Sequence, residues 1–104
     1  MHLARLDEAI REGQIIVQID PVSSAAHSAL GRFLYGARRY EEALPHQLRA
    51  FELEPRSIHA NYRLGDLYTE LARYDDAIAA YERTNETMKK PLTSALRIRL
   101  SAKS

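Results

Sequence analysis

Apolar residues between Ser24 and Ala37 recur at steps of three and four, which is the spacing of one face of an α-helix. Five residues form this stripe: Ala26, Leu30, Phe33, Leu34 and Ala37. A helix of this kind buries its apolar face against a neighbour. The pattern therefore predicts an all-α protein of packed helices.

The same residue types recur at positions i and i+34 in several places along the chain. The residues at this spacing are Ala9, Ala43 and Ala77, Leu30 and Leu64, Gly31 and Gly65, Tyr40 and Tyr74, and Pro21 and Pro55. When residues 24–57 are laid over residues 58–91, eight positions are identical, against roughly two expected from ordinary composition. The chain thus contains an internal repeat, and a period of this length is typical of stacked helical hairpins.

The repeated residues resemble the signature of the tetratricopeptide repeat in type and spacing. They are Leu30, Gly31, Leu34, Tyr40, Ala43, Ala50 and Pro55 in the first unit, and Leu64, Gly65, Tyr68, Tyr74, Ala77 and Tyr81 in the second. The resemblance implies an α-solenoid of antiparallel helix pairs, wound into a right-handed superhelix of about six helices. It implies one domain over residues 1–104, made of a half repeat at 1–21, full repeats at 24–57 and 58–91, and a capping helix at 92–104.

Three polar residues stand where the family usually has an aromatic ring. His27 and Asn61 do so early in each unit, and Gln47 does so in the second half of the first unit. We expect His27 to fill part of the core, because histidine is commonly semi-buried.

Two glycines and one proline are unfavourable inside the expected helices. Gly31 and Gly65 each cost roughly 1 kcal/mol relative to alanine in mid-helix, so we expect a neighbouring helix to approach closely at both. The small residues Ala43 and Ala77 on the facing helix allow such contact. Pro45 removes a hydrogen bond and clashes one turn back, which predicts a bend near residues 41–43 or a late helix start.

The composition fits one domain of packed helices, with 104 residues, 45% hydrophobic and 28% charged, and a net charge of +1. The absence of cysteine excludes a disulfide framework, a zinc–thiolate site and a thiol nucleophile. Apolar runs such as 15–17 are far too short to span a bilayer, and the N-terminus lacks the features of a secretory signal. We therefore expect no membrane association and a cytoplasmic location.

The sequence contains no recognisable catalytic, cofactor or metal motif. Its four histidines, His2, His27, His46 and His59, never stand in the paired i, i+4 arrangement of a helical zinc site. No glycine-rich phosphate loop or nucleophile elbow is present. We expect a protein that is not an enzyme and that uses neither a cofactor nor a metal ion.

In the proteins that this chain resembles, the first helices of successive units line a concave groove that holds an extended peptide or a partner helix. The residues expected to contact the partner are Arg32, Tyr35, His59, Tyr62, Arg63, Asp66, Leu96, Arg97 and Leu100. Arginine binds carboxylates in bidentate fashion, so three guanidiniums in one groove favour an acidic ligand. The resemblance implies a non-catalytic protein-interaction module. The competing interpretation is that Asp66 or Glu70 neutralises Arg63 as a solvated pair.

Self-association is the alternative function. The helix before residue 21 has lost its own first partner, so we expect some of its apolar residues to lack a cover and to form a homodimer interface. These residues are Leu6, Ile10, Ile15, Ile16 and Ile19. We expect no nucleic-acid binding, because the basic stretch 83–104 carries no aromatic residue that could stack on bases.

Overall fold

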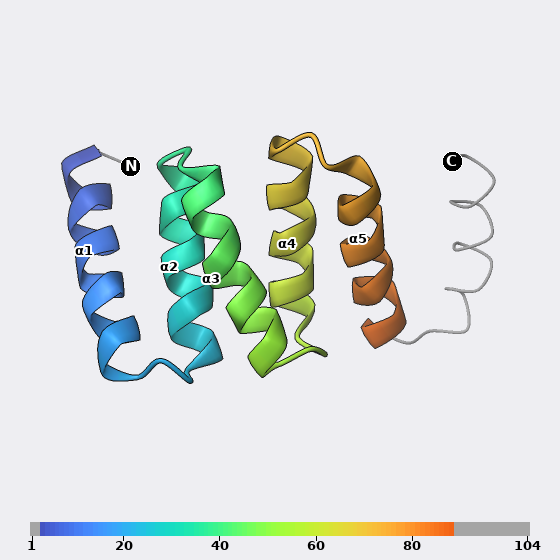
Figure 1. Ribbon diagram of the computed structural model, residues 1–104, viewed down its shortest axis with the longest axis horizontal. Coiled ribbons are helices and arrows are strands. Elements are labelled where there is room, and N and C mark those ends of the chain that lie inside the picture. Colours follow the sequence, from blue (N-terminus) through green and yellow to red (C-terminus); the bar gives the residue numbers. More distant parts are fainter. Residues whose placement is uncertain (1–2, 89–104) are drawn as a thin grey trace.

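The computed structural model describes residues 3–88, which form five α-helices (Figure 1). The helices are α1 (Leu3–Ile19), α2 (Ser24–Gly36), α3 (Tyr40–Leu53), α4 (Ile58–Glu70) and α5 (Tyr74–Met88). The all-α prediction is therefore confirmed for this part of the chain. The capping helix expected at 92–104, which would be the sixth, lies outside the described residues.

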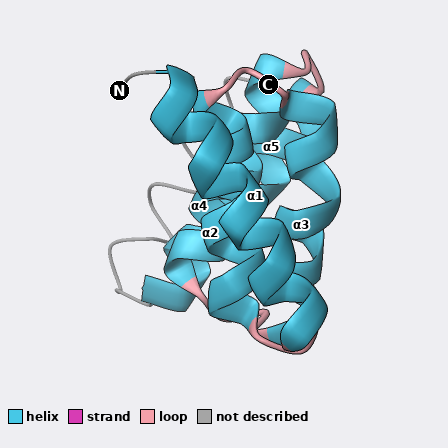
Figure 2. Cartoon of the chain, turned by 90° about the vertical axis from the view of Figure 1, so that its left-hand side faces the viewer, coloured by secondary structure: helices cyan, strands magenta, loops and turns pink. Residues whose placement is uncertain are grey.

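The helices stack in antiparallel pairs along the long axis of Figure 1. The most extensive contacts join α2 to α3 and α4 to α5, and smaller ones join α1 to α2 and α3 to α4. In the end-on view of Figure 2, α2 and α4 lie on one side of the stack and α3 and α5 on the other. The first helices of the two repeats are thus neighbours, as a solenoid of helix pairs requires.

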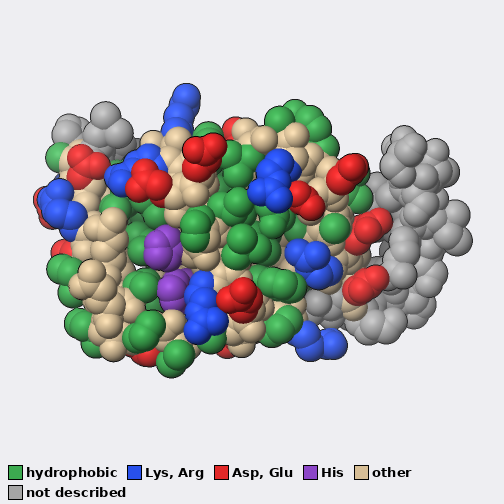
Figure 3. Space-filling model, viewed as in Figure 1, with side chains coloured by type: hydrophobic (Ala, Val, Ile, Leu, Met, Phe, Trp, Pro, Cys, Tyr) green, Lys and Arg blue, Asp and Glu red, His purple; other side chains and the backbone are tan. Residues whose placement is uncertain are grey.

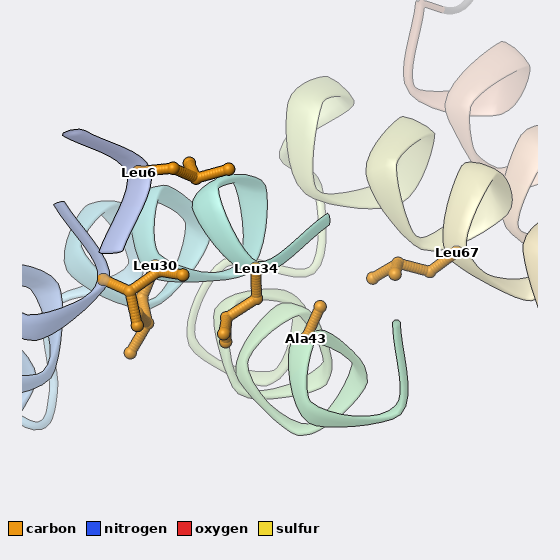
Figure 4. Packing of buried hydrophobic residues seen from close by; sticks show 6 residues of the cluster. Leu6, Leu30, Leu34, Ala43 and Leu67 are labelled. Carbon is orange, nitrogen blue, oxygen red and sulfur yellow. The ribbon is translucent and has the colours of Figure 1, made fainter. Parts of the chain in front are cut away.

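The core is a chain of small apolar clusters between successive helices. One cluster joins α1, α2, α3 and α4 through Leu6, Ile10, Leu30, Leu34, Ala43 and Leu67 (Figure 4). A second joins α4 and α5 through Leu64, Tyr68, Ala77 and Ala80. Two of the five α1 residues named as candidates for an uncovered face are therefore covered by α2, since Leu6 and Ile10 are 5% and 2% exposed.

Gly31 and Gly65, the two glycines at equivalent repeat positions, lie where another side chain passes. A Cβ atom added at Gly31 would lie 2.6 Å from Nε2 of Gln47, and one added at Gly65 would overlap the ring of Tyr81. Gln47 and Tyr81 occupy equivalent repeat positions on the facing helices α3 and α5. Close approach at the two glycines is thus present, and it serves these longer side chains as well as the buried alanines of the same helices.

The helix starts follow from local hydrogen bonds. Ser23 and Ser57 cap α2 and α4, each accepting a bond from the backbone N–H three residues later, at 3.1 and 3.2 Å. Helix α3 begins at Tyr40 and runs through Pro45, so the late start, one of the two predicted alternatives, does not occur. The early start persists because Ala43, which is fully buried, bonds through its N–H to the Arg39 carbonyl at 3.0 Å.

Candidate functional site

A groove lies between the N-terminal halves of α2 and α4, which are the first helices of the two repeats. It encloses about 380 Å³ and is lined by Ser24, Ala25, Ser28, Ala29, Arg32, Glu54, Ser57, His59 and Arg63. Its polar lining comes from two helix starts, where unpaired backbone N–H groups and the helix dipole favour negative charge. Glu54 is the acidic residue in this lining.

A small cavity adjoins the groove. That cavity has a volume of about 10 Å³ and is lined by Gly31, Arg32, Tyr35, Gln47, Arg63, Asp66 and Leu67. Arg32 and Arg63 line both spaces, so the groove and the cavity meet at these two side chains.

The structure brings five of the residues predicted from sequence together around this groove. They are Arg32, Tyr35, His59, Arg63 and Asp66. Tyr62 lines neither space. Its ring packs edge-on against Tyr81, with 5.7 Å between the ring centroids. The other three predicted residues, Leu96, Arg97 and Leu100, lie outside the described residues.

The two arginines that line the groove are not neutralised by an acidic side chain of residues 3–88. Among residues 3–88, neither Arg32 nor Arg63 forms an ion pair with a carboxylate, whereas Arg39, Arg49 and Arg73 each pair with an acid three residues later. The Arg32 guanidinium lies 5.3 Å from the centre of the Phe33 ring. The solvated pair considered for Arg63 is thus not seen in the described part of the chain.

Asp66 bonds to Tyr81 and forms no ion pair with Arg63. Its carboxylate accepts a hydrogen bond of 2.6 Å from the Tyr81 hydroxyl. Burial, together with this bond, raises the pKa of Tyr81 to about 12. Burial likewise raises the pKa of Tyr35, and the negative charges of Asp66 and Glu70 add to that effect. The cavity that Tyr35 lines therefore contains the acidic Asp66 beside the basic Arg32 and Arg63.

Sequence reasoning missed the contribution of Gln47 to the cavity wall and of Ser24 and Ser57 to the groove. The sequence marks Gln47 only as a departure from the usual aromatic residue. Its place in the cavity wall could have been suspected from that departure, because a polar residue at an otherwise aromatic core position needs a hydrogen-bond partner. Ser24 and Ser57 gave no comparable signal.

The described residues contain neither a group of side chains suited to a metal ion nor a membrane-spanning helix. No group of three or more histidine or acidic side chains there could hold a metal ion. No helix in residues 3–88 is long and apolar enough to cross a bilayer.

Comparison with solved structures shows the same arrangement of helices at low sequence identity. MamA of AMB-1 matches with a TM-score of 0.77 and 20% identity, over 84% of this chain and 52% of that one. MamA of MSR-1 matches with a TM-score of 0.77 and 20% identity, over 84% of this chain and 50% of the MamA chain. The Yersinia enterocolitica type III secretion translocator chaperone SycD matches with a TM-score of 0.77 and 15% sequence identity, over 95% of this chain and 76% of the SycD chain. The chain thus spans about half the length of the MamA structures.

A search of curated protein sequences found no match. The profile described as tetratricopeptide repeat matches residues 34–99, which is more than half of the chain. The repeat length, the paired helices and this match agree, and the chain belongs to the tetratricopeptide repeat family.

Proposed function

We propose that this chain is a non-catalytic interaction module that holds an acidic peptide or partner helix in the groove between α2 and α4. Domains of this family are generally protein–protein interaction modules and are typically non-catalytic. The observation that carries the acidic ligand is the pair Arg32 and Arg63, which come from two different helices to one groove and form no ion pair within residues 3–88.

The chemistry of this pair suits a carboxylate. A guanidinium presents N–H donors in a fixed fork that can bind both oxygens of a carboxylate, and such charge-assisted bonds are stronger than neutral ones. The two helix starts add favourable potential at their own end of the groove, more than one turn away from the arginines. Because helices rather than loops hold the arginines, little conformational entropy is lost when a ligand binds.

Charge reversal at the two arginines tests the proposal. Arg32→Glu combined with Arg63→Glu should weaken binding of a short labelled peptide of alternating Asp and Leu by more than about tenfold, measured by fluorescence polarisation. The matched control is Arg5→Glu with Arg11→Glu, which makes the same change in net charge at exposed positions of α1. Circular dichroism of each variant verifies that the helices persist.

The comparison between the two double variants decides the outcome. Loss of binding in the groove variant alone supports the proposal. Equal loss in both variants would mean that the peptide responds to net charge rather than to this groove. Equal binding by wild type and groove variant, or no binding by the wild type, would refute an acidic ligand here.

Self-association is the second candidate, and the exposed side of α1 favours it. Ile15, Ile16 and Ile19 are 55%, 52% and 78% exposed, which is a large apolar surface for one helix. The structure of SycD with a similar fold is described as an alternative dimer. Ile10 is buried in the core, so it does not belong to such an interface and its replacement would disturb the fold.

Sedimentation velocity tests this candidate. A homodimer through α1 should dissociate when Ile16→Asp and Ile19→Asp are combined, because two charges would then be buried unpaired in the interface. Gln14→Asp with Gln18→Asp, at exposed positions of the same helix, serves as the control. A wild-type protein that stays monomeric at high concentration would exclude the dimer.

A further inference from the structure

A second groove runs between α1 and α2, at one end of the stack in Figure 1. It encloses about 310 Å³. Its apolar lining consists of Ala9, Gly13 and Ile16 from α1 and Ala26, Ala29 and Phe33 from α2. Glu12 is the charged residue of this lining. The groove is therefore mostly apolar, and its one edge on α1 carries negative charge.

The matching places in the next repeat are covered by a helix. Leu67 stands 34 residues after Phe33, and Ala50 stands 34 residues after Ile16. Leu67 and Ala50 are buried, whereas Phe33 is half-buried and Ile16 is 52% exposed. Helix α2 packs against both α3 and α4, on which Ala50 and Leu67 lie, while within residues 3–88 α1 contacts no helix other than α2. The groove thus lies where the rest of the stack has a helix.

The residue at the middle of the groove indicates which side chains such a helix can carry. Gln47 and Tyr81 pass over Gly31 and Gly65, so the first helix of each repeat needs a glycine there. The equivalent residue of α1 is Gly13, which has no side chain to accommodate. A helix bound here therefore needs no glycine at that point and can present a large apolar residue instead.

The exposed side of α1 that borders the groove combines isoleucines with acids. Ile15 and Ile19 lie on the same side as Ile16, and Glu8 lies one turn before Glu12. Neither glutamate forms an ion pair within residues 3–88. Arg5, the basic residue on this side, lies near the start of α1 and away from the isoleucines.

These charges distinguish between possible occupants of the groove. A second copy of the chain would bring its own Glu8 and Glu12 to the interface together with its isoleucines. A helix with lysine or arginine beside its apolar side would instead meet the two glutamates with opposite charge, which is favourable.

We infer that the groove between α1 and α2 binds a basic amphipathic helix of a partner protein. The apolar side of that helix packs against Ile16 and Phe33, and its basic side chains face Glu8 and Glu12. This site is separate from the groove between α2 and α4 and takes a ligand of opposite charge, so it does not depend on the function proposed for Arg32 and Arg63.

A synthetic helix tests the apolar part of the inference. The probe is a fluorescently labelled peptide whose leucines recur at steps of three and four and whose other residues are lysine and alanine. Ile16→Ser should weaken its binding by about tenfold or more, because less apolar surface is then buried. The side chain is half exposed in the free protein, and circular dichroism verifies that the variant keeps its helices. A scrambled peptide of the same composition should bind at least about tenfold more weakly.

A pair of double variants tests the charged part. Glu8→Gln with Glu12→Gln should weaken binding of the same peptide by about threefold to tenfold at low salt. Gln14→Lys with Gln18→Lys makes an equal change in net charge at exposed positions on the other side of α1, and it should have a smaller effect. Equal losses in the two variants would mean that the peptide responds to net charge alone, and the inference would be wrong.

The remaining outcomes also decide the matter. Failure of the wild type to bind the helical peptide, or equal binding of the scrambled peptide, would refute the site. A wild-type dimer that Ile16→Ser dissociates and that the peptide does not disrupt would show that a second copy covers this face instead.

Discussion

His27 and Asn61, which occupy equivalent positions in successive repeats, make the same hydrogen bond. Nε2 of His27 donates to the Pro21 carbonyl at 2.8 Å, and Nδ2 of Asn61 donates to the Pro55 carbonyl at 2.9 Å. Both side chains are buried, as expected for His27 from its place in the repeat. Each therefore ties the first helix of its repeat to the turn that precedes it, a role that an aromatic hydrocarbon ring could not fill.

Replacing Asn61 with leucine should be destabilising although the side chain keeps a similar size. The change removes the bond to Pro55 and leaves Nε of Arg83 without the Asn61 oxygen that it reaches at 2.8 Å. We expect a loss of about 1–3 kcal/mol in the free energy of unfolding, measured by urea denaturation. Gln18→Leu on the exposed face of α1 is the control, and equal midpoints for the two variants would contradict the prediction.

The two repeat glycines should respond differently to alanine. At Gly65 the new methyl group meets the rigid ring of Tyr81, and overpacking of this kind costs roughly 1–3 kcal/mol. At Gly31 it meets the buried side chain of Gln47, with less overlap than at Gly65, and the better helix propensity of alanine, worth about 1 kcal/mol, offsets part of the displacement. Thermal denaturation should therefore show a larger loss for Gly65→Ala than for Gly31→Ala. Similar losses in both would show that the side-chain partner is unimportant.

The sequence was sufficient for the repeat and its helices because these depend on spacing alone. Repeated residues such as Gly31 and Gly65 show where two helices approach, whatever fills the gap. The identity of the filling side chain follows from atomic packing, so the contrast between Gln47 and Tyr81 became visible only in the structure.

The repeat period also predicted part of the lining of the candidate groove. The period placed Arg32 and Arg63 on neighbouring first helices, and both line the groove. It also placed Tyr62 there, and this residue lines neither the groove nor the cavity, although its ring contacts Tyr81 edge-on and stays 54% exposed.

Two residues outside the regular helices adopt a left-handed backbone, and one of them offers a simple gain in stability. Arg38 and Ala72 have φ angles of 62° and 61° directly after the ends of α2 and α4. Glycine is preferred at this position because it lacks the Cβ atom that makes the conformation unfavourable. Ala72→Gly should raise the free energy of unfolding by roughly 0.5–1 kcal/mol after the extra backbone entropy of glycine is subtracted. Ala79→Gly, at an exposed site within α5, should lower it, and a gain in both variants would contradict the argument.

A pair of histidines links α2 to α3 and makes the stability of the fold depend on pH. Because Nε2 of His27 donates to a carbonyl, its Nδ1 is the acceptor in the neutral ring, and Nδ1 of His46 donates to it at 3.2 Å. The two rings stack with centroids 5.4 Å apart, and the histidine side chains on the face shown in Figure 3 lie next to each other over α2 and α3. Burial lowers the pKa of His46, and the nearby charge of His27 lowers it further.

The lowered pKa of His46 fixes the direction of the pH effect. The unfolded chain binds a proton at this site at a higher pH than the folded chain does, so acid favours unfolding. The contribution is fully present above about pH 6.5, the ordinary value for histidine, and is lost as the pH falls below it toward the lower value in the folded protein. Melting temperatures measured between about pH 5 and pH 7.5 should therefore rise with pH. In His46→Asn, whose amide can still donate to His27, the rise should be smaller. An equally steep rise in this variant would assign the effect to groups other than His46.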